Sequence, residues 1–329
     1  MKCRLCDSTE VFVLHKQVDG FRINKKFDIV RCKSCKVAFT HPFLTKKEYE
    51  DFHNSHQVVF NGAGDEETVQ DYLDNKELYW ERLGFNKRLL FFRSIHPAAK
   101  NILDIGCGAG FMLDFLSNND YKVAGIELSP WGHQIATKKL GLDVKNSRIE
   151  DLDPPRTKFD IITMYDVIEH TTQPSETLRS IRKWLAKDGK IVMNLPNLDS
   201  FISRAAGKHW NKLTPPDHTF HFNKPSITYL LNRSGFKVLN VATNAGSPNE
   251  FMSQLAGSTW RLPAKVSKKF SQAVETQNQQ YSKNKSLHLK LIKGSKRAAN
   301  KTGFAAKPIL PLLSKAGYGE GMNIVATAA

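Results

Sequence analysis

The pattern of apolar and polar positions changes its period repeatedly between residues 100 and 195. Short apolar runs, which are typical of buried strands, alternate with segments whose apolar residues recur every three or four positions, which is typical of helices. This alternation predicts a parallel sheet with helices on both faces. The predicted strands are 101–105, 122–126, 143–145, 159–164 and 190–195, and the predicted helices are 110–118, 130–140 and 174–187.

Similar patterns predict further elements on both sides of this region. Loose alternation near the N-terminus indicates a hairpin, and a polar stretch after residue 45 indicates a helix followed by a linker. The hairpin is expected at 11–30, further helices at 77–95 and from a Ser226 cap to Arg233, and further strands at 236–243 and 321–328.

The first predicted strand runs into a turn with three alternate glycines, Gly106, Gly108 and Gly110. Glycine is needed where a ligand approaches the backbone so closely that a Cβ would block it. The spacing differs from the G-x-G-x-x-G of dinucleotide sites, and Asp104 stands just before the first glycine. A carboxylate suits a cationic ligand better than a pyrophosphate. Cys107, inside the turn, is expected to be a small packing residue.

A second acid follows at the end of the next predicted strand. Glu127, with Leu128 after it, lies about 20 residues beyond the glycines, where a carboxylate can accept hydrogen bonds from both hydroxyls of a ribose. Ser129 and Pro130 are suited to begin the following helix. The alternative interpretation is a strand–turn–helix unit that binds no ligand, but two acids in register with the glycines argue against it.

This combination of glycine turn and acids resembles the first motif of class I S-adenosylmethionine-dependent methyltransferases. The resemblance implies an α/β, Rossmann-like sheet of seven strands, mostly parallel, with the last strand inserted antiparallel beside the sixth. It also implies contacts to the cofactor from Arg88, Tyr165, Glu150 and Asp151, in addition to the turn. The alternatives for the arginine and for the acidic loop are an ordinary solvated helix face and a solvated turn.

Four cysteines near the N-terminus form two Cys-x-x-Cys pairs. Cys3 and Cys6 are separated by some twenty-odd residues from Cys32 and Cys35, which is the spacing of a zinc ribbon. Four thiolates close a tetrahedral site and leave no position for water, so the predicted Zn²⁺ is structural. The alternative is a set of free thiols or a redox pair.

Two segments at the predicted carboxyl edge of the sheet carry candidates for acid–base chemistry. The segment that ends in Glu169-His170 resembles a stretch of the ubiquinone-biosynthesis methyltransferases and related small-molecule methyltransferases, and Asp217-His218 resembles an acid–histidine pair of zinc-ribbon sugar C-methyltransferases. An imidazole with an orienting carboxylate is a usual general base. His218 with Asp217 is the first candidate and His170 the second. The alternatives are a packing role for His170 and a loop that only covers the cofactor.

Composition places this chain among soluble proteins with an unusual charge distribution. No apolar run is long enough for a transmembrane helix and no signal peptide is evident, so a reducing, cytoplasmic location is expected. The net charge is +16, and residues 257–315 contribute thirteen Lys or Arg against the single acid Glu275. This basic segment, with interleaved apolar residues, suits an anionic membrane surface, such as the inner face of the membrane, or a polyanion. A solvated helical cap is the alternative.

Together these patterns predict a zinc ribbon (1–45), a linker with a helix (46–76), a methyltransferase core (77–245), a basic, helical insertion (246–318) and a final core strand (319–329). The predicted function is methyl transfer from S-adenosylmethionine to a small-molecule, sugar, or glycan- or lipid-linked acceptor. An RNA methyltransferase is the alternative enzyme, although the Asn/Asp-Pro-Pro-aromatic motif of base methylation is missing after the fourth core strand. The alternative outside catalysis is an adaptor that keeps the cofactor fold. The sequence does not indicate the oligomeric state.

Overall fold

The computed structural model describes residues 1–45, 47–49, 51–52, 65–244 and 309–329. Its contacts divide the chain into two compact units. The large unit comprises Met1–Pro196, Thr214–Val241 and Met322–Ala329, and the small unit comprises Asn197–Leu213 and Ala242–Gly321. The functional residues predicted from the sequence, apart from the basic segment, lie in the large unit.

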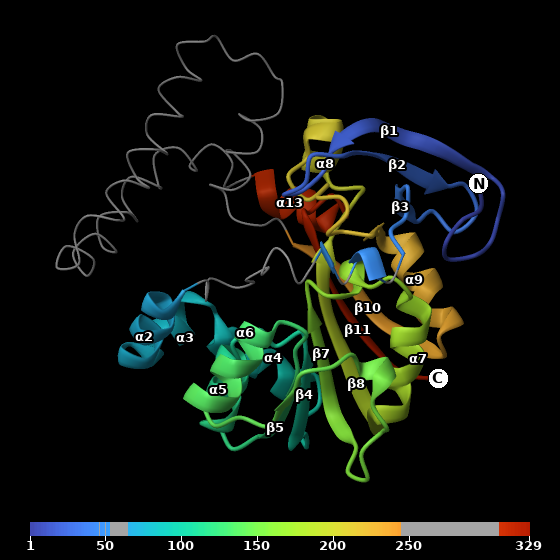
Figure 1. The fold of residues 1–329 in the computed structure, drawn as a ribbon. Coiled ribbons are helices and arrows are strands. Elements are labelled where there is room, and N and C mark those ends of the chain that lie inside the picture. Colours follow the sequence, from blue (N-terminus) through green and yellow to red (C-terminus); the bar gives the residue numbers. More distant parts are fainter. Residues whose placement is uncertain (46, 50, 53–64, 245–308) are drawn as a thin grey trace. The chain divides into compact units, whose positions relative to one another are not determined.

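A mixed, mostly parallel sheet of seven strands forms the centre of the large unit (Figure 1). Its strand order is β10-β11-β8-β7-β4-β5-β6, and the pairs β4–β5, β4–β7, β5–β6 and β7–β8 are parallel. The last strand of the chain therefore returns beside the sixth predicted strand, as expected. The strands are β4 (Asn101–Ile105), β5 (Lys122–Ile126), β6 (Val144–Lys145), β7 (Phe159–Tyr165), β8 (Leu185–Pro196), β10 (Phe236–Asn244) and β11 (Gly321–Ala328).

Alternate residues of the central strands pack into two separate apolar clusters, one on each face of the sheet. Ile102 and Ile161 belong to the cluster that includes residues of α4 (Phe85–Ile95) and α5 (Phe111–Ser117). Their neighbours Leu103 and Ile162 belong to the cluster that includes residues of α7 (Pro174–Trp184) and α9 (Lys224–Arg233). Because side chains alternate between faces along a strand, burial on both faces produces continuous apolar runs. These runs are the pattern from which the strands were predicted.

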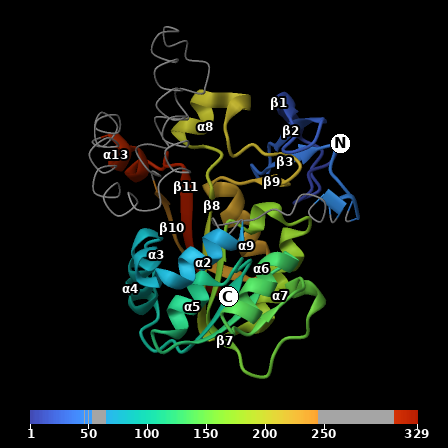
Figure 2. The same cartoon turned by 60° about the vertical axis from the view of Figure 1, so that its left-hand side comes forward.

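A second sheet of four strands, in the order β1-β2-β3-β9, contains the N-terminal segment (Figure 2). β1 (Val11–Asp19) and β2 (Lys26–Cys32) form the predicted hairpin, and β3 (Ala38–His41) pairs antiparallel with β2. The fourth strand, β9 (Phe220–His221), comes from a distant part of the chain and pairs antiparallel with β3. The sequence pattern did not predict this strand, because two residues are too short to show a period.

Three predicted helices differ from the observed ones for local reasons. The segment 77–95 is two helices, α3 (Lys76–Arg82) and α4, because Gly84 between them adopts a left-handed conformation with φ of 70°. The segment 130–140 is α6 (Pro130–Gln134) continued by a π-helical turn, Ile135–Lys139. The residue that caps α9 is Asn223, since its side chain accepts a hydrogen bond from the N–H of Ser226.

Further short helices lie in the predicted linker and in the small unit. The predicted linker contains α2 (Glu66–Asp74), whose N-terminus is capped by Asp65. The small unit contains α8 (Phe201–Ala206) and α13 (Ile309–Lys315). In that unit the side-chain amide of Asn197 donates hydrogen bonds to the carbonyls of Gly317 and Gly319 at 3.2 and 2.8 Å. The predicted basic insertion lies largely outside the described residues, since residues 245–308 are not described.

None of the helices in the described parts of the chain has the length and apolar character needed to cross a membrane.

The two left-handed glycines at the starts of helices α4 and α5 provide a matched test of this architecture. Gly84→Ala places a Cβ in open space, so only the left-handed backbone is penalised, by about 1–2 kcal/mol. Gly110→Ala carries the same penalty at φ of 81° and also puts its Cβ 2.7 Å from Leu142 Cδ1. We expect Gly110→Ala to lower the urea midpoint of unfolding clearly more than Gly84→Ala. Equal midpoints for the two variants would contradict the packing described for the glycine turn.

Candidate functional site

The turn between β4 and α5 brings the backbone close to its neighbours, as the glycine pattern predicts. Gly106 has φ of 73°, and a Cβ added there would lie 2.5 Å from Cγ2 of Val167. Val167 follows β7, the strand beside β4, so the two strand ends meet at the turn. Gly110, at φ of 81°, occupies the position just before α5. The turn therefore tolerates no ordinary side chain at either glycine.

Glu127, at the end of β5, points at this turn. One of its carboxylate oxygens accepts the N–H of Gly108 at 2.7 Å, and the other accepts the N–H of Ser129 at 2.6 Å. The side-chain amide of Asn146 donates to the carbonyls of Glu127 and Leu128 at 2.8 and 2.9 Å. Burial raises the pKa of Glu127, while the hydrogen bonds to its carboxylate act in the opposite direction. Each carboxylate oxygen retains a lone pair with which it can accept a further donor.

Asp104 lies on β4 and is buried, with 5% of its surface exposed. Its neighbour across the sheet is Thr163, whose hydroxyl donates a hydrogen bond to Oδ1 of Asp104 at 2.6 Å. Burial raises the pKa of Asp104 to about 7, although this hydrogen bond and the charge of Arg88 oppose the shift. A nearby positive charge would stabilise the ionised form of this carboxyl group and lower its pKa.

Arg88 of α4 reaches the same region. Its guanidinium lies 4.3 Å from the centre of the Tyr165 ring and 3.4 Å from the sulfur of Met112. Tyr165 is the last residue of β7, so the two predicted cofactor contacts are brought together with Asp104. Arg88 therefore places a positive charge near the buried carboxyl group of Asp104.

The remaining predicted cofactor residues have different surroundings. Cys107 is buried, in agreement with a packing role, and Leu128 is 55% exposed. Glu150 accepts a hydrogen bond from the hydroxyl of Thr177 in α7, and Asp151 is exposed. The carboxylate of Glu150 therefore has a hydrogen-bond partner in α7, and its predicted contact with the cofactor stays a prediction.

Helices α2 and α3 are attached to the first helix after the turn by a buried polar cluster. The hydroxyl of Tyr72 donates to Asp114 at 2.6 Å, and Lys76 forms an ion pair with the same carboxylate at 2.8 Å. The ring of Tyr72 stacks on that of Phe111, with 3.7 Å between the centroids. Since Phe111 directly follows Gly110, this cluster fixes the end of the glycine turn.

Acid and histidine side chains from two distant segments meet in a second buried group. His170 lies at the end of the 3₁₀ turn Ile168–His170 after β7, and its Nδ1 is 3.3 Å from Oδ1 of Asp217. The rings of His170 and His218 are in edge contact at 4.5 Å, and His221 lies 6.2 Å from His218. The structure therefore brings all three predicted catalytic residues together, and it joins the carboxylate of Asp217 to His170, which was the second candidate.

The protonation of this group follows from burial and from the Asp217 charge. Burial opposes a charged imidazole at His170, but the Asp217 carboxylate outweighs it and raises the pKa of His170 to about 9. Burial lowers the pKa of His221 to about 3, so His221 is neutral at physiological pH. At neutral pH, His170 is accordingly an imidazolium paired with a carboxylate.

Glu169 is the residue of this group that the sequence analysis did not single out. It is 2% exposed, and within the described parts of the chain neither carboxylate oxygen has a hydrogen-bond partner. Burial raises its pKa to about 8, with the charge of His170 opposing the shift. The ligand atoms of Glu169, His170 and His218 lie within 4.8 Å of one another, a separation at which they could also share a cation. The sequence signal was present, as an acid next to the candidate histidine.

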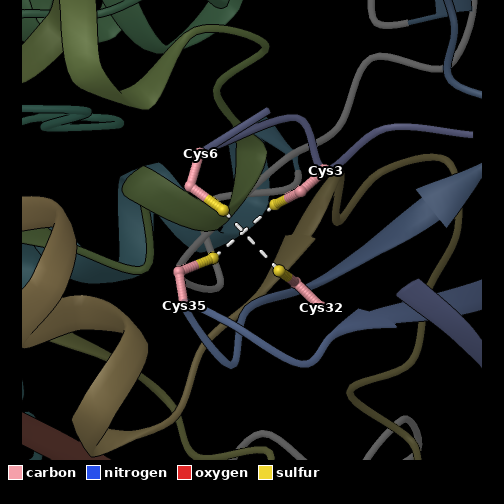
Figure 3. Close-up of side chains that lie close together, drawn as sticks. All are labelled: Cys3, Cys6, Cys32 and Cys35. Atoms are coloured by element: carbon pink, nitrogen blue, oxygen red, sulfur yellow. Dashed lines mark hydrogen bonds between the residues drawn. The ribbon is translucent and has the colours of Figure 1, made fainter. Parts of the chain in front are cut away.

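The four N-terminal cysteines converge on one point (Figure 3). Sγ of Cys3 lies 3.6 Å from Sγ of Cys35, and Sγ of Cys6 lies 3.6 Å from Sγ of Cys32. None of them forms a disulfide. A tetrahedral metal with bonds of about 2.3 Å to sulfur separates its ligand atoms by about 3.8 Å, which these distances match closely.

Two partners of the site were missed for different reasons. Thr163 faces Asp104 across β4 and β7, and aligning the two predicted strands would have revealed it. Tyr49 donates a hydrogen bond to the carbonyl of Asp217 at 3.2 Å across 168 residues of sequence. No sequence pattern indicates such a long-range contact.

Comparisons with known proteins agree with this geometry. Residues 79–241 match a family model described as a methyltransferase domain. A mitochondrial ubiquinone biosynthesis O-methyltransferase of Schizosaccharomyces pombe is 29% identical over 37% of this chain and 49% of its own length. A ubiquinone biosynthesis O-methyltransferase of Actinobacillus pleuropneumoniae is 27% identical over 38% of this chain and 58% of its own length. The chain thus spans about half the length of these curated relatives.

Among solved structures, an S-adenosylmethionine-dependent methyltransferase of Thermotoga maritima, named as a possible histamine N-methyltransferase, is 22% identical. The matched region covers 54% of this chain and 84% of the Thermotoga maritima chain, with a TM-score of 0.41.

Glu169 makes a testable contribution to the pH dependence of stability. The folded protein keeps a proton on Glu169 up to a pH of about 8, whereas the ordinary pKa of this group is 4.5. The folded state therefore binds more protons between these values, and the free energy of unfolding falls as the pH rises, by up to about 1.4 kcal/mol per pH unit. Glu169→Gln removes this titration, so urea unfolding at pH 5 to 8 is expected to show a shallower decline.

The exposed Glu48 provides the control. The N–H and hydroxyl of Thr45 lower its pKa, so Glu48→Gln should leave the slope above pH 5 unchanged. If Glu169→Gln and the native chain have the same slope, the carboxylate is not buried as described.

Proposed function

Because residues 79–241 belong to the class I S-adenosylmethionine-dependent methyltransferases, we propose that this chain methylates a hydroxyl group of a small molecule. The observation that carries the proposal is the convergence of two acids, the buried Asp104 and the half-buried Glu127, on a glycine turn with a left-handed backbone. This environment favours a ligand with positive charge and disfavours phosphate. The O-methyltransferase names of the relatives support oxygen as the methylated atom.

The cofactor residues divide into a ribose side and a methionine side. Glu127 would accept hydrogen bonds from the ribose, since its carboxylate already faces the turn at Gly108. Asp104 lies below the turn and would favour the positive end of the ligand, and Arg88 would meet its carboxylate. When bound, S-adenosylmethionine supplies an electrophilic methyl group whose carbon–sulfur bond breaks with the electron pair remaining on sulfur. We further propose cofactor contacts from Tyr165, Cys107, Leu128, Glu150 and Asp151, of which Tyr165 lies beside Arg88.

The histidine group would act on the acceptor. His170 is held as an imidazolium by Asp217, so it is poorly suited to receive a proton at neutral pH. His218, in edge contact with His170, is the better candidate to take the acceptor's hydroxyl proton as the oxygen attacks the methyl carbon. Asp217 and His170 would then be positioning residues. A sugar or lipid-linked acceptor, and methylation of carbon, are compatible with the same base.

The four cysteines are proposed to bind a structural Zn²⁺. Their sulfur–sulfur distances of 3.6 Å fit a tetrahedral ion, and four protein ligands leave no position for a substrate. We expect one zinc per chain by atomic absorption of the purified full-length protein. A chain that is folded, reduced and free of zinc would contradict this assignment.

We also propose that the basic segment 257–315 contacts an anionic membrane surface or a polyanion, and hence that the protein has a cytoplasmic, peripheral location. Most of it lies outside the described residues, so only its charge supports this. An RNA substrate is the alternative, and retention on an RNA column that weakens steeply with salt would favour it.

Calorimetry tests the cofactor site. The zinc-loaded chain is expected to bind S-adenosylmethionine and to show no heat with NAD⁺. Glu127→Gln should weaken binding about 10- to 100-fold, because hydrogen bonds to a charged group contribute roughly 1.5–3 kcal/mol. Glu10→Gln, an exposed acid of the N-terminal segment, is the control and should bind normally. A native chain that gives no heat with S-adenosylmethionine would contradict the proposed function and favour a non-catalytic adaptor.

Release of S-adenosylhomocysteine tests the proposed base. A panel of hydroxyl-bearing aromatic compounds and sugars is used to find an acceptor. His218→Asn is then expected to slow methyl transfer by roughly 10²- to 10⁴-fold, the usual contribution of a general base, with unchanged affinity for S-adenosylmethionine. His209→Asn, at an exposed histidine, is the matched control. If His218→Asn keeps full activity, methyl transfer does not depend on this base.

A further inference from the structure

The loop that carries Asp217 and His218 is part of the sheet that contains the cysteine cluster. Its strand β9 is the fourth strand of that sheet, with Ala38 opposite His221 and Phe39 opposite Phe220. The N–H of Phe21, just after β1, also donates to the carbonyl of Pro215 at 2.6 Å. The histidine loop and the N-terminal segment therefore share one hydrogen-bonded network.

Thr40 of β3 contacts three residues of the histidine loop. Its hydroxyl donates to the carbonyl of His218 at 2.8 Å, and its N–H donates to the carbonyl of Thr219 at 3.0 Å. The same hydroxyl lies 3.5 Å from Nε2 of His221. Thr40 is 2% exposed, so water does not readily replace these bonds. A single side chain of the N-terminal segment thus touches both histidines of the loop.

The opposite edge of the loop is attached to the segment after β7. The N–H of Thr219 donates to the carbonyl of Glu169 at 2.9 Å, and its hydroxyl donates to the carbonyl of Thr171 at 2.6 Å. His170 contacts Asp217 at this edge. The loop is therefore held between β3 on one side and the segment of Glu169 and His170 on the other.

The cysteine cluster directly precedes β3. The N–H of Cys32 donates to the carbonyl of Val37 at 2.9 Å, which closes the tight turn that contains Cys35 and leads into Ala38. Four-cysteine sites in small modules contribute the free energy of metal binding to folding. An ion bound by the four cysteines would therefore order β3, and with it the edge on which the histidine loop is built.

We propose that Thr40 is a positioning residue of the acceptor site and that the metal-loaded N-terminal sheet holds the histidine loop in place for methyl transfer. That this site binds the acceptor rests on the proposed function. The hydrogen bonds of Thr40 to the histidine loop are observed independently of it. The cofactor turn has its own supports, since Glu127 holds Gly108 and Thr163 holds Asp104. Loss of the Thr40 contacts should consequently disturb the histidine loop and leave the affinity for the cofactor unchanged.

Hydrogen–deuterium exchange of the full-length, zinc-loaded chain tests this. Thr40→Val keeps the shape of the side chain but loses the hydroxyl, and we expect peptides over 214–222 to exchange about five- to tenfold faster, as for one lost hydrogen bond. Thr40→Ser restores the hydroxyl and should restore protection. Peptides over 104–110, zinc content and affinity for S-adenosylmethionine should remain as in the native chain for both variants.

A reciprocal variant separates the two sides of the site. Thr163→Val removes the hydroxyl that binds Asp104, so it should weaken S-adenosylmethionine binding and leave exchange over 214–222 unchanged. Removal of zinc from the native chain with a chelator should accelerate exchange over 214–222 at least as much as Thr40→Val.

Unchanged exchange over 214–222 in zinc-loaded Thr40→Val would overturn the inference, and so would a uniform acceleration along the whole chain. Failure of the native chain to bind S-adenosylmethionine would instead remove the proposed function, and the exchange results would still report on the contact between Thr40 and the loop.

Discussion

The carboxylate of Glu127 forms the interaction on which the ligand-facing edge of the sheet depends. It accepts one N–H from the turn after β4 and one from the start of α6, so it joins the segments that follow two different strands, β4 and β5. Hydrogen bonds to an ionised acceptor are stronger than those between neutral groups. Without this acid, the N–H groups that face it would need water or a ligand, and the glycine turn would lose its support from β5.

Burial raises the pKa of Asp104, Glu127 and Glu169. Such groups are costly for stability, because a buried carboxyl must either keep its proton or find a counter-charge. Asp104 and Glu127 surround the glycine turn, whereas Glu169 lies in the histidine group. Functional sites commonly concentrate groups of this type, and here two separate concentrations lie at the ends of adjacent parallel strands, β4 and β7.

Features of the fold could be predicted from the sequence where the residues that form them are close together along the chain. Strands β4 and β5 were predicted at their observed bounds, because a parallel strand buried on both faces is a continuous apolar run. The single helix predicted over 77–95 was wrong because a left-handed glycine interrupts it without changing the apolar period. Residues such as Asp104 and Glu127 could be proposed from spacing along the chain, since strand and turn are local. Thr40 and Tyr49 could not, because their partners lie 178 and 168 residues away.

The pairing of β3 with β9 has a consequence for biosynthesis. A ribosome completes β1, β2 and β3 long before it reaches Phe220, so the nascent N-terminal sheet has an open edge at β3 while the nucleotide-binding strands are still being made. An unpaired edge strand is a template for association with other chains. The edge of β3 therefore stays open to association during translation until two residues, Phe220 and His221, pair with it.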